Sequence, residues 1–454
     1  MIGLVVNPVA GVGGPAGLAG SDGADVQRLA LARGARSRVQ ERAAAALAVL
    51  AAQHPSLVVV TAAGAMGADA VRAAGLVPCV VYSAGADPAC VCAGEPAAER
   101  PASAASPGPV GAEGRTDAAD TSRAVCAVAA AGADLVLVVG GDGTLRDAVS
   151  GLDAASPCDP SGESPDAGRH AAETPDGREN SRQTDAAAEE DGRMPDERMP
   201  DGRMPDGPTP AVLGVPAGVK MYSPVFAVSP AAAGAIAAEW VSAGGLPTEE
   251  REVLDIDEAA MRRARVDPVL HGFLRVPVRR GRTQARKAPT PATEAAAVEA
   301  AARGAVARMR PGIRYLLGPG GTTAEVARQL DVDGTPLGVD VILDGALIRR
   351  AASEQELLAE IAAGPAQAVV TVIGGQGFLL GRGNQQLSAS VLGALGDDPL
   401  LVVAPEQKII DLHGRPLLVD TGDADLDARL AGHVRITTGV GTSSLYAVAA
   451  SHTL

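Results

Sequence analysis

The segment VLVVGGDGTLRD, residues 136–147, places an acid, Asp142, among glycines at the end of an apolar run. Its small neighbours are Gly140, Gly141, Gly143 and Thr144. A glycine-rich loop after a buried strand lets the backbone approach phosphates, and the next helix N-terminus supplies N–H donors. An acid there accepts the proton of an attacking hydroxyl or holds magnesium. The segment predicts phosphoryl transfer, with a tight turn and an acid at a helix start as the alternative.

A second glycine-rich loop, NPVAGVGGPAG at residues 7–17, follows the first apolar run of the chain. Its spacing matches a dinucleotide fold, but prolines interrupt the joint between strand and helix, and no acid follows at the expected distance. A Rossmann dehydrogenase is therefore a weak alternative. We expect Asn7 and the glycines to hold a nucleotide's phosphates or ribose, unless the segment is an ordinary surface loop. The chain has no Walker A loop, because no lysine follows a glycine.

Other polar residues are weaker candidates. Lys220 follows a glycine-containing turn and is predicted to touch phosphate or to be a solvated surface lysine. Asp147 follows Asp142 on the same helix and is a candidate magnesium ligand, as is Asp142 itself. Glu406 and Lys408 follow a strand, where an exposed pair is the simpler interpretation.

The composition limits the partners. The 454 residues carry a net charge of −15, with 46% hydrophobic but only 2% aromatic residues, and three lysines against 36 arginines. An acidic surface repels nucleic acid and anionic membranes, so neither is expected as a partner. No apolar stretch has the length of a membrane helix, and the N-terminus lacks a signal peptide's basic region. We expect a cytoplasmic protein with reduced cysteines.

Short apolar runs alternate with helical stretches. The predicted strands are residues 2–6, 57–60, 77–82, 135–139 and 211–215. Helices are predicted at 40–51 and 117–131, the second with Thr116 as its N-cap. This alternation of apolar strands and helices favours a parallel sheet covered on both faces.

The domain organisation is predicted from changes in this pattern. Residues 1–152 and 210–228 are expected to form an α/β nucleotide-binding domain, and 229–454 a second domain that completes the site. Between the parts of the first domain, residues 153–209 contain the repeat RMPDE RMPDG RMPDG and little to bury, so we expect a disordered insertion. Residues 87–115 read as a loose loop rich in Pro, Ala, Gly and Ser.

The GGDGT motif after an apolar strand resembles the signature shared by NAD kinases, diacylglycerol and sphingosine kinases, and phosphofructokinases. Further segments resemble the predicted ATP-NAD kinase family of bacteria and archaea: GLVVNPVAGVGGPAGLAGSDG (3–23), GVPAGVKMYSPVFA (214–227), EVLDIDE (252–258), LLGPGGTTAEVA (316–327), LGVDVILDG (337–345), VIGGQGFLLGRGNQQLS (372–388) and RPLLVDTGD (415–423). The resemblance implies an α/β N-terminal domain, a more β-rich α+β C-terminal domain, and a site between them.

The resemblance also implies roles for single residues. Asp142 corresponds to the base that deprotonates the ribose 2′-hydroxyl of NAD. The GGTTAEV segment resembles the Gly-Ser-Thr-Ala stretch that NAD kinases use around the dinucleotide, which implicates Gly320, Gly321, Thr322 and Thr323. A glycine turn and threonine cap that open a helix would give the same pattern. The Asn-Glu or Asn-Asp pair of typical NAD kinases is missing, and Asn384 is a candidate substitute.

Together these features predict an NAD kinase that uses ATP or polyphosphate with Mg²⁺, and that self-associates as members of the superfamily commonly do. The first alternative is a kinase of another small-molecule or lipid hydroxyl. The second is a regulatory protein that binds a dinucleotide without turnover. Tight NAD binding without phosphate transfer would distinguish the second alternative.

Overall fold

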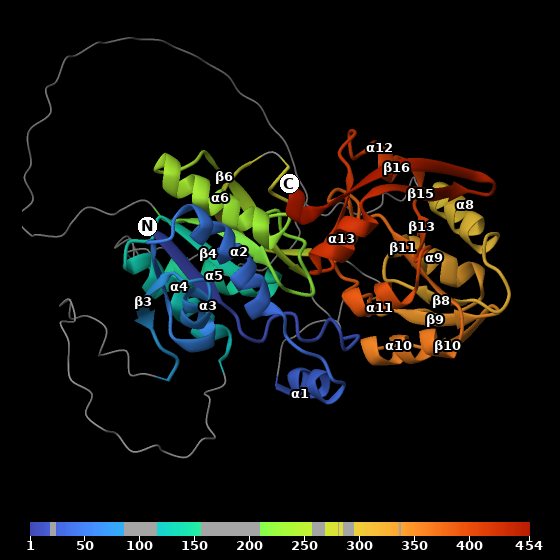
Figure 1. Ribbon diagram of the computed structural model, residues 1–454, viewed down its shortest axis with the longest axis horizontal. Coiled ribbons are helices and arrows are strands. Elements are labelled where there is room, and N and C mark those ends of the chain that lie inside the picture. The colour runs from blue at the N-terminus through green and yellow to red at the C-terminus, as the bar shows by residue number, and fades with distance from the viewer. Residues whose placement is uncertain are drawn as a thin grey trace, which may run out of the picture. The chain divides into compact units, whose positions relative to one another are not determined.

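The computed structural model describes most of the chain (Figure 1). The described residues are 1–18, 24–85, 116–155, 209–256, 268–279, 281–284, 295–335 and 337–454. They belong to one compact unit. The predicted loop at 87–115 and nearly all of the predicted insertion at 153–209 lie outside them. Among the described residues, no helix combines the length and apolar character needed to cross a membrane.

The first sheet is fully parallel and has five strands in the order β3-β2-β1-β4-β5. The strands are β1 (Ile2–Val6), β2 (Val58–Ala62), β3 (Val77–Tyr82), β4 (Leu135–Gly140) and β5 (Ala211–Pro216). All five predicted strands are confirmed to within two residues. Strands β1, β4 and β5 are buried along their whole length, as expected for a sheet covered on both faces.

Helices accompany this sheet in the predicted alternation. They are α1 (Ala24–Ala32), α2 (Val39–Gln53), α3 (Ala68–Ala73), α4 (Ala118–Ala130), α5 (Asp142–Ala155) and α6 (Pro230–Ala243), with a 3₁₀ turn η1 (Gly64–Met66). The predicted N-cap Thr116 is wrong by one residue. Asp117 caps α4, because its side chain accepts from the Asp120 amide at 2.9 Å while the Asp120 carboxylate accepts from the Asp117 amide at 2.9 Å.

A two-stranded antiparallel ribbon packs on the same core. It consists of β6 (Thr248–Ile256) and β7 (Pro268–Pro277). Val253, Leu274 and Val276 of the ribbon are buried in the hydrophobic cluster of the first sheet, together with residues of α6. Helix α6 and the ribbon therefore pack on the core of the first sheet, although they follow the predicted domain boundary at residue 229.

The second sheet is mixed and has nine strands in the order β10-β9-β8-β11-β13-β15-β16-β14-β12. These are β8 (Arg314–Leu317), β9 (Asp340–Leu343), β10 (Ala346–Arg349), β11 (Ala366–Thr371), β12 (Phe378–Leu380), β13 (Leu400–Val403), β14 (Leu417–Val419), β15 (Gly432–Gly439) and β16 (Thr442–Ala450). Strands β8, β11, β13 and β15 are parallel to one another. A parallel N-terminal sheet followed by a strand-rich mixed sheet confirms the predicted fold class.

Helices of the second half cover both faces of its sheet. They are α8 (Ala295–Val306), α9 (Gly321–Gln329), α10 (Glu354–Ala363), α11 (Ala389–Ala394), α12 (Glu406–Ile410), α13 (Ala424–Leu430) and the 3₁₀ turn η4 (Ser451–Thr453). One face, which includes Val369 and Val403, packs against α8 and α9. The opposite face, which includes Val370 and Val402, packs against α10 and α11. Successive strand residues point to opposite faces, so each core needs its own set of helices.

A buried ionic cluster joins the two sheets. Arg42 of α2 donates two hydrogen bonds to Asp420, after β14, at 2.9 and 3.1 Å. Arg382, after β12, donates to the same carboxylate at 2.8 Å and to the Val228 carbonyl at 2.9 Å. Burial by itself raises the pKa of Asp420, but the two guanidinium groups outweigh it and lower the pKa to about 2. One carboxylate thus holds two arginines that come from different halves of the chain.

The substitution Asp420→Asn tests this cluster. It removes the carboxylate that pairs with both the buried Arg382 and the largely buried Arg42, and we expect the free energy of unfolding to fall by about 3–5 kcal/mol. The matched control is Asp333→Asn, which removes an exposed carboxylate paired with Arg350 and should change stability by less than about 1 kcal/mol. Denaturant unfolding of the wild type and of the two variants measures both changes in stability. Equal effects of the two substitutions would mean that the cluster does not hold the halves together.

Candidate active site

Asp142 lies where three parallel strands end. It follows β4, is the first residue of α5 and is 1% exposed. Strand β4 lies between β1 and β5. Val139 of β4 pairs with Val6 of β1, and Gly140 of β4 pairs with Pro216 of β5. The loops that follow β1 and β5 therefore flank the GGDGT loop, at the edge of the sheet where ligands bind in such folds.

Two glycine loops make close backbone contact at this edge. A Cβ built on Gly218 would lie 2.3 Å from the Gly141 Cα, and one built on Gly141 would lie 2.9 Å from the Lys220 carbonyl oxygen. The Gly140 carbonyl accepts from the amides of Ala217 and Gly218, both at 2.9 Å. Larger residues at Gly141 and Gly218 would push the two loops apart. The glycines beside Asp142 are thus needed for the contact with the loop after β5.

This contact surrounds the Asp142 carboxylate with donors. One oxygen accepts from the Tyr222 amide at 2.6 Å, and the other accepts from the Ser223 amide at 3.1 Å and hydroxyl at 2.7 Å. Burial raises the pKa of Asp142 and the three donors oppose it, while the charge of Asp255 adds to the rise; the resulting pKa is about 6. A carboxyl with this pKa is mostly ionised at neutral pH and is a stronger base than an exposed aspartate.

The predicted partners Asn7 and Thr144 lie beside each other. The Asn7 side-chain amide, after β1, donates to the Thr144 hydroxyl at 3.1 Å, and the Asn7 side-chain carbonyl accepts from the Val9 amide at 3.2 Å. The Gly141 amide donates to the Thr144 hydroxyl at 3.4 Å. The structure thus brings Asn7, Gly140, Gly141, Gly143 and Thr144 together around the start of α5.

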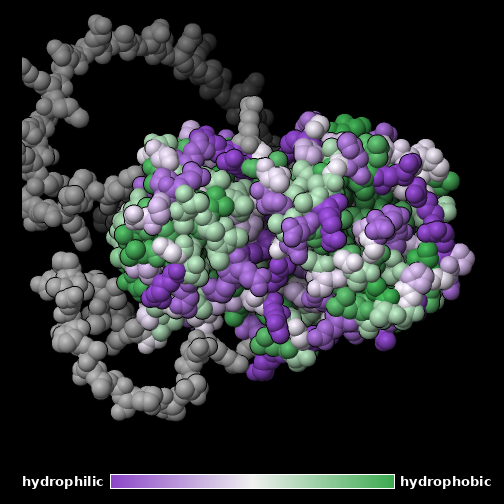
Figure 2. Space-filling view, in the orientation of Figure 1, coloured by the Kyte–Doolittle hydropathy of each residue, from purple (hydrophilic) through white to green (hydrophobic). Residues whose placement is uncertain are grey.

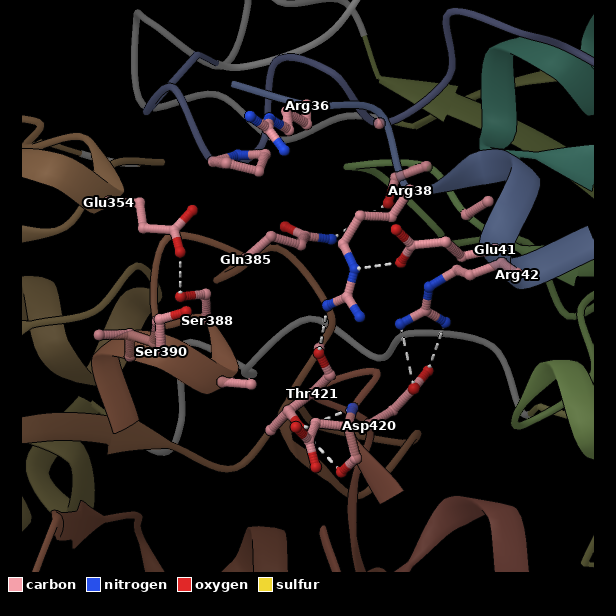
Figure 3. Close-up of a pocket in the computed structure, with 18 of the residues that line it drawn as sticks. Arg36, Arg38, Glu41, Arg42, Glu354, Gln385, Ser388, Ser390, Asp420 and Thr421 are labelled. Atoms are coloured by element: carbon pink, nitrogen blue, oxygen red, sulfur yellow. Dashed lines mark hydrogen bonds and ion pairs between the residues drawn. The ribbon is translucent and has the colours of Figure 1, made fainter. Parts of the chain in front are cut away.

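A cavity of about 630 Å³ lies on the other side of the loop after β5. Ala217, Gly218 and Met221 line it, directly before the two residues that hold Asp142. The opposite walls come from the 34–42 segment and from α10, α11 and loops of the second half of the chain (Figure 3). The segment 217–223 therefore separates the cavity from the Asp142 carboxylate.

Arginines contribute much of the charge in this cavity. Arg38 pairs with Glu41 at 3.0 Å and donates to the carbonyls of Thr421 and Gly422 at 2.9 and 2.8 Å. Arg42 is held by Asp420. Arg36 is exposed and has no hydrogen bond or ion pair to any other described residue. Figure 3 shows these side chains on one side of the cavity, with Glu354 and Ser388 facing them.

The predicted magnesium ligands Asp142 and Asp147 lie on the same helix. Asp147 is five residues from Asp142 on the same helix, so the two side chains point in different directions. The Asp147 carboxylate pairs with Arg146 at 3.2 Å. Within the described ranges, no group of three or more His, Cys, Asp or Glu side chains could hold a metal. Magnesium is usually bound by one or two carboxylates together with substrate phosphates, so magnesium binding by Asp142 and Asp147 stays a prediction.

The remaining predicted residues lie in three places. Lys220 precedes Met221, and its carbonyl accepts from the Asp142 amide at 3.1 Å. Gly320, Gly321, Thr322 and Thr323 open α9 after β8 in the second sheet. Asn384 is buried, with its side-chain oxygen bound to the Gly381 amide at 2.9 Å and its nitrogen to the Leu379 carbonyl at 2.8 Å. Asn384 therefore shapes its own loop, and its contact with a dinucleotide stays a prediction.

Sequence reasoning missed Tyr222, Ser223 and the arginines of the cavity. Tyr222 and Ser223 act mainly through backbone amides, which no residue type reveals. Arg36, Arg38 and Arg42 lie among 36 arginines of the chain, so composition gave no reason to single them out. Their spacing in GARSRVQER, which runs into the first turn of α2, was the available signal.

The pKa of Asp142 is directly measurable. We expect its carboxyl ¹³C resonance, assigned by its loss in Asp142→Asn, to titrate near pH 6 in protein labelled at aspartate Cγ. The Asp420 carboxyl, with a pKa of about 2, should stay ionised over the same range. Because the folded pKa of Asp142 lies above the unfolded one, its ionisation should lower the free energy of unfolding as the pH rises from about 4 to about 6. A midpoint near pH 4 for Asp142 would contradict the described burial.

Comparison with known families gives two matches in order along the chain. The ATP-NAD kinase N-terminal domain matches residues 2–158, and the ATP-NAD kinase C-terminal domain matches residues 311–448. No curated protein and no solved structure gave a match. The two matched ranges contain the GGDGT loop with Asp142 and the glycine loop before α9. The chain belongs to the ATP-NAD kinase family, a family of phosphotransferases.

Proposed function

We propose that this chain transfers a phosphoryl group from ATP, or polyphosphate, to the 2′-hydroxyl of NAD and thereby forms NADP. The observation that carries the proposal is the Asp142 carboxylate, buried, with a pKa of about 6, at the start of a helix that follows a glycine loop. Membership in the ATP-NAD kinase family supports the reaction class. The pKa suits a group that removes a proton near neutral pH.

Asp142 would act as general base. Its carboxylate accepts the proton of the attacking hydroxyl while the hydroxyl oxygen forms the new bond to phosphorus. The resting carboxylate is 1% exposed and bound by Tyr222 and Ser223, so this segment must move to admit the hydroxyl. Its movement removes donors that lower the pKa of Asp142. The carboxylate becomes more basic as the substrate reaches it.

The groups around α5 would position the donor phosphates. The start of α5 directs backbone amides and the positive end of the helix dipole toward this edge of the sheet. Asn7 and Thr144 fix the loop beside it. Arg36 and Arg38 in the cavity, and Lys220 next to its wall, supply positive charge that offsets the phosphates. Much of the rate gain in such a transfer comes from this positioning and neutralisation.

The nature of the cavity favours a nucleotide over a lipid acceptor. Charged and polar side chains make up much of its lining, among them Arg36, Glu41, Gln385 and Ser388. In the view of Figure 2, hydrophilic and hydrophobic side chains are interspersed over the surface. A lipid acceptor requires an apolar entrance, which this lining does not provide. Gly320, Gly321, Thr322 and Thr323 are our candidates for contacts with the dinucleotide.

Turnover of purified protein with NAD, ATP and Mg²⁺ tests the proposal. We expect NADP to form, and Asp142→Asn to lower kcat by roughly 10²- to 10⁴-fold, the usual contribution of a general base. Binding of NAD to the variant should change little, because the substitution keeps the size of the side chain. Asp153→Asn is the matched control, since Asp153 is an exposed residue of the same helix.

Two results would contradict the proposal. Failure of the wild-type protein to make NADP with ATP or with polyphosphate would exclude NAD as the acceptor. A rate for Asp142→Asn similar to that of Asp153→Asn would exclude Asp142 as the base.

A further inference from the structure

The Tyr222 amide that donates to Asp142 belongs to a peptide group that is also held from its other side. The carbonyl oxygen of this group, that of Met221, accepts from the side-chain Nε2 atoms of Gln284 and Gln376, both at 2.9 Å. The amide end donates to the Asp142 carboxylate at 2.6 Å. A single planar peptide group thus connects two glutamine side chains to the carboxylate.

Both glutamine side chains are buried, and their orientation is fixed. Gln284 is 2% exposed and Gln376 is 6% exposed. The Oε1 atom of Gln284 accepts from Arg382 Nε at 3.2 Å. A guanidinium group only donates, so Gln284 must turn Nε2 toward the Met221 carbonyl. Gln376 must also present Nε2, because Oε1 in its place would repel the carbonyl oxygen.

The two glutamines come from outside the glycine loops of the site. Gln284 follows β7, and its backbone amide donates to the Phe226 carbonyl at 2.8 Å. Gln376 lies in the turn between β11 and β12 of the second sheet. Neither glutamine is among the residues that line the cavity beside the segment 217–223. They therefore act on Asp142 through the peptide group rather than through contact with a substrate in the cavity.

The donors on the two oxygens of Asp142 differ in how firmly they are held. The amide on Oδ2 belongs to the peptide group that the glutamines hold. The Ser223 hydroxyl has one proton but two acceptors, Asp142 Oδ1 at 2.7 Å and the Leu254 carbonyl at 3.1 Å. When this hydroxyl turns toward Leu254, Oδ1 keeps only the Ser223 amide at 3.1 Å. Oδ1 can then accept a substrate hydroxyl while the bond to Oδ2 keeps the carboxylate oriented.

We propose that Gln284 and Gln376 are positioning residues for the phosphoryl transfer, because they hold the peptide group that orients the Asp142 carboxylate. Hydrogen bonds in a buried chain strengthen one another, so the two bonds to the Met221 carbonyl also strengthen the bond from the Tyr222 amide. The inference deepens the proposed function and rests on it in one respect, since it takes Asp142 as the base.

This peptide group can be observed by itself, because Met221–Tyr222 is the single Met–Tyr pair in the sequence. Protein labelled with ¹³C at the methionine carbonyl and with ¹⁵N at tyrosine gives one cross-peak in a carbonyl-to-amide NMR correlation spectrum. We expect its amide proton at low field, since the amide makes a short, charge-assisted hydrogen bond. Asp142→Asn removes the charge and should move this proton to higher field, which sets the scale of the measurement.

Gln284→Met and Gln376→Met each remove one donor from the carbonyl of this peptide group and keep the approximate size of the side chain. In each variant the amide proton should move to higher field, and in the double variant it should move further. Gln386→Met is the matched control. Gln386 is 1% exposed and makes no hydrogen bond to the segment 217–223, all of which the structure describes. Its substitution should leave the cross-peak in place.

Turnover distinguishes positioning from a general loss of stability. If NADP is formed, we expect kcat to fall by roughly ten- to hundredfold in Gln284→Met and in Gln376→Met, the effect of a misplaced catalytic group. The KM for NAD should change little, because neither glutamine lines the cavity. Gln386→Met should keep the kcat of the wild type.

The outcomes separate this inference from the proposed function. An amide proton that does not respond to Asp142→Asn would overturn the inference without any glutamine variant. A proton that keeps its wild-type position in both glutamine variants, or that moves equally in Gln386→Met, would also overturn it, as would an unchanged kcat, even if NADP is formed. A movement confined to Gln284→Met and Gln376→Met would support the hold on Asp142 even if no NADP is formed, and the proposed function alone would then fail.

Discussion

The hydrogen bonds between the Asp142 carboxylate and the Tyr222–Ser223 backbone are the interaction on which the site depends. An ionised carboxylate that is 1% exposed needs donors on both oxygens. Those donors reach it only because Gly141 and Gly218 let two backbone segments touch. The segment that supplies them also lines the cavity. The contact between these two loops therefore determines the pKa of Asp142 and its burial. It also forms the wall that a substrate must displace.

The ionic cluster of Arg42, Asp420 and Arg382 fulfils a similar requirement between the two sheets. Burial of one carboxylate beside two guanidinium groups is favourable only when every charge is hydrogen-bonded. Arg382 meets this condition with further bonds to Val228 and to Gln284, at 2.9 and 3.2 Å, and by stacking 4.1 Å over Phe378. Asp420 and Arg42 then form part of the cavity wall. The contact that joins the sheets also shapes the candidate binding site.

Patterns within short segments of the sequence predicted the features that depend on interactions between residues close together in the chain. Apolar runs gave the five strands of the first sheet, and the GGDGT loop gave the carboxylate among glycines. The donors of Asp142 could not be predicted in this way, because Tyr222 and Ser223 are 80 and 81 residues away and two of their three hydrogen bonds come from backbone amides. The ribbon β6–β7 was expected in the second domain, because the alternation of apolar strands and helices changes before it. Its inner side chains instead fill the core of the first sheet. Asn384 resembled a ligand-binding residue by type, but its amide holds its own loop.

The measurement that tests the account most directly is the pH dependence of kcat/KM for NADP formation by the wild type and by Ser223→Ala. We expect the wild-type kcat/KM to fall as the pH drops below about 6, because protonation of Asp142 removes the base. Ser223→Ala removes the hydroxyl that donates to Asp142 at 2.7 Å, so its inflection should move to higher pH. An inflection at the same pH in both proteins would contradict the assignment of Asp142 as the base.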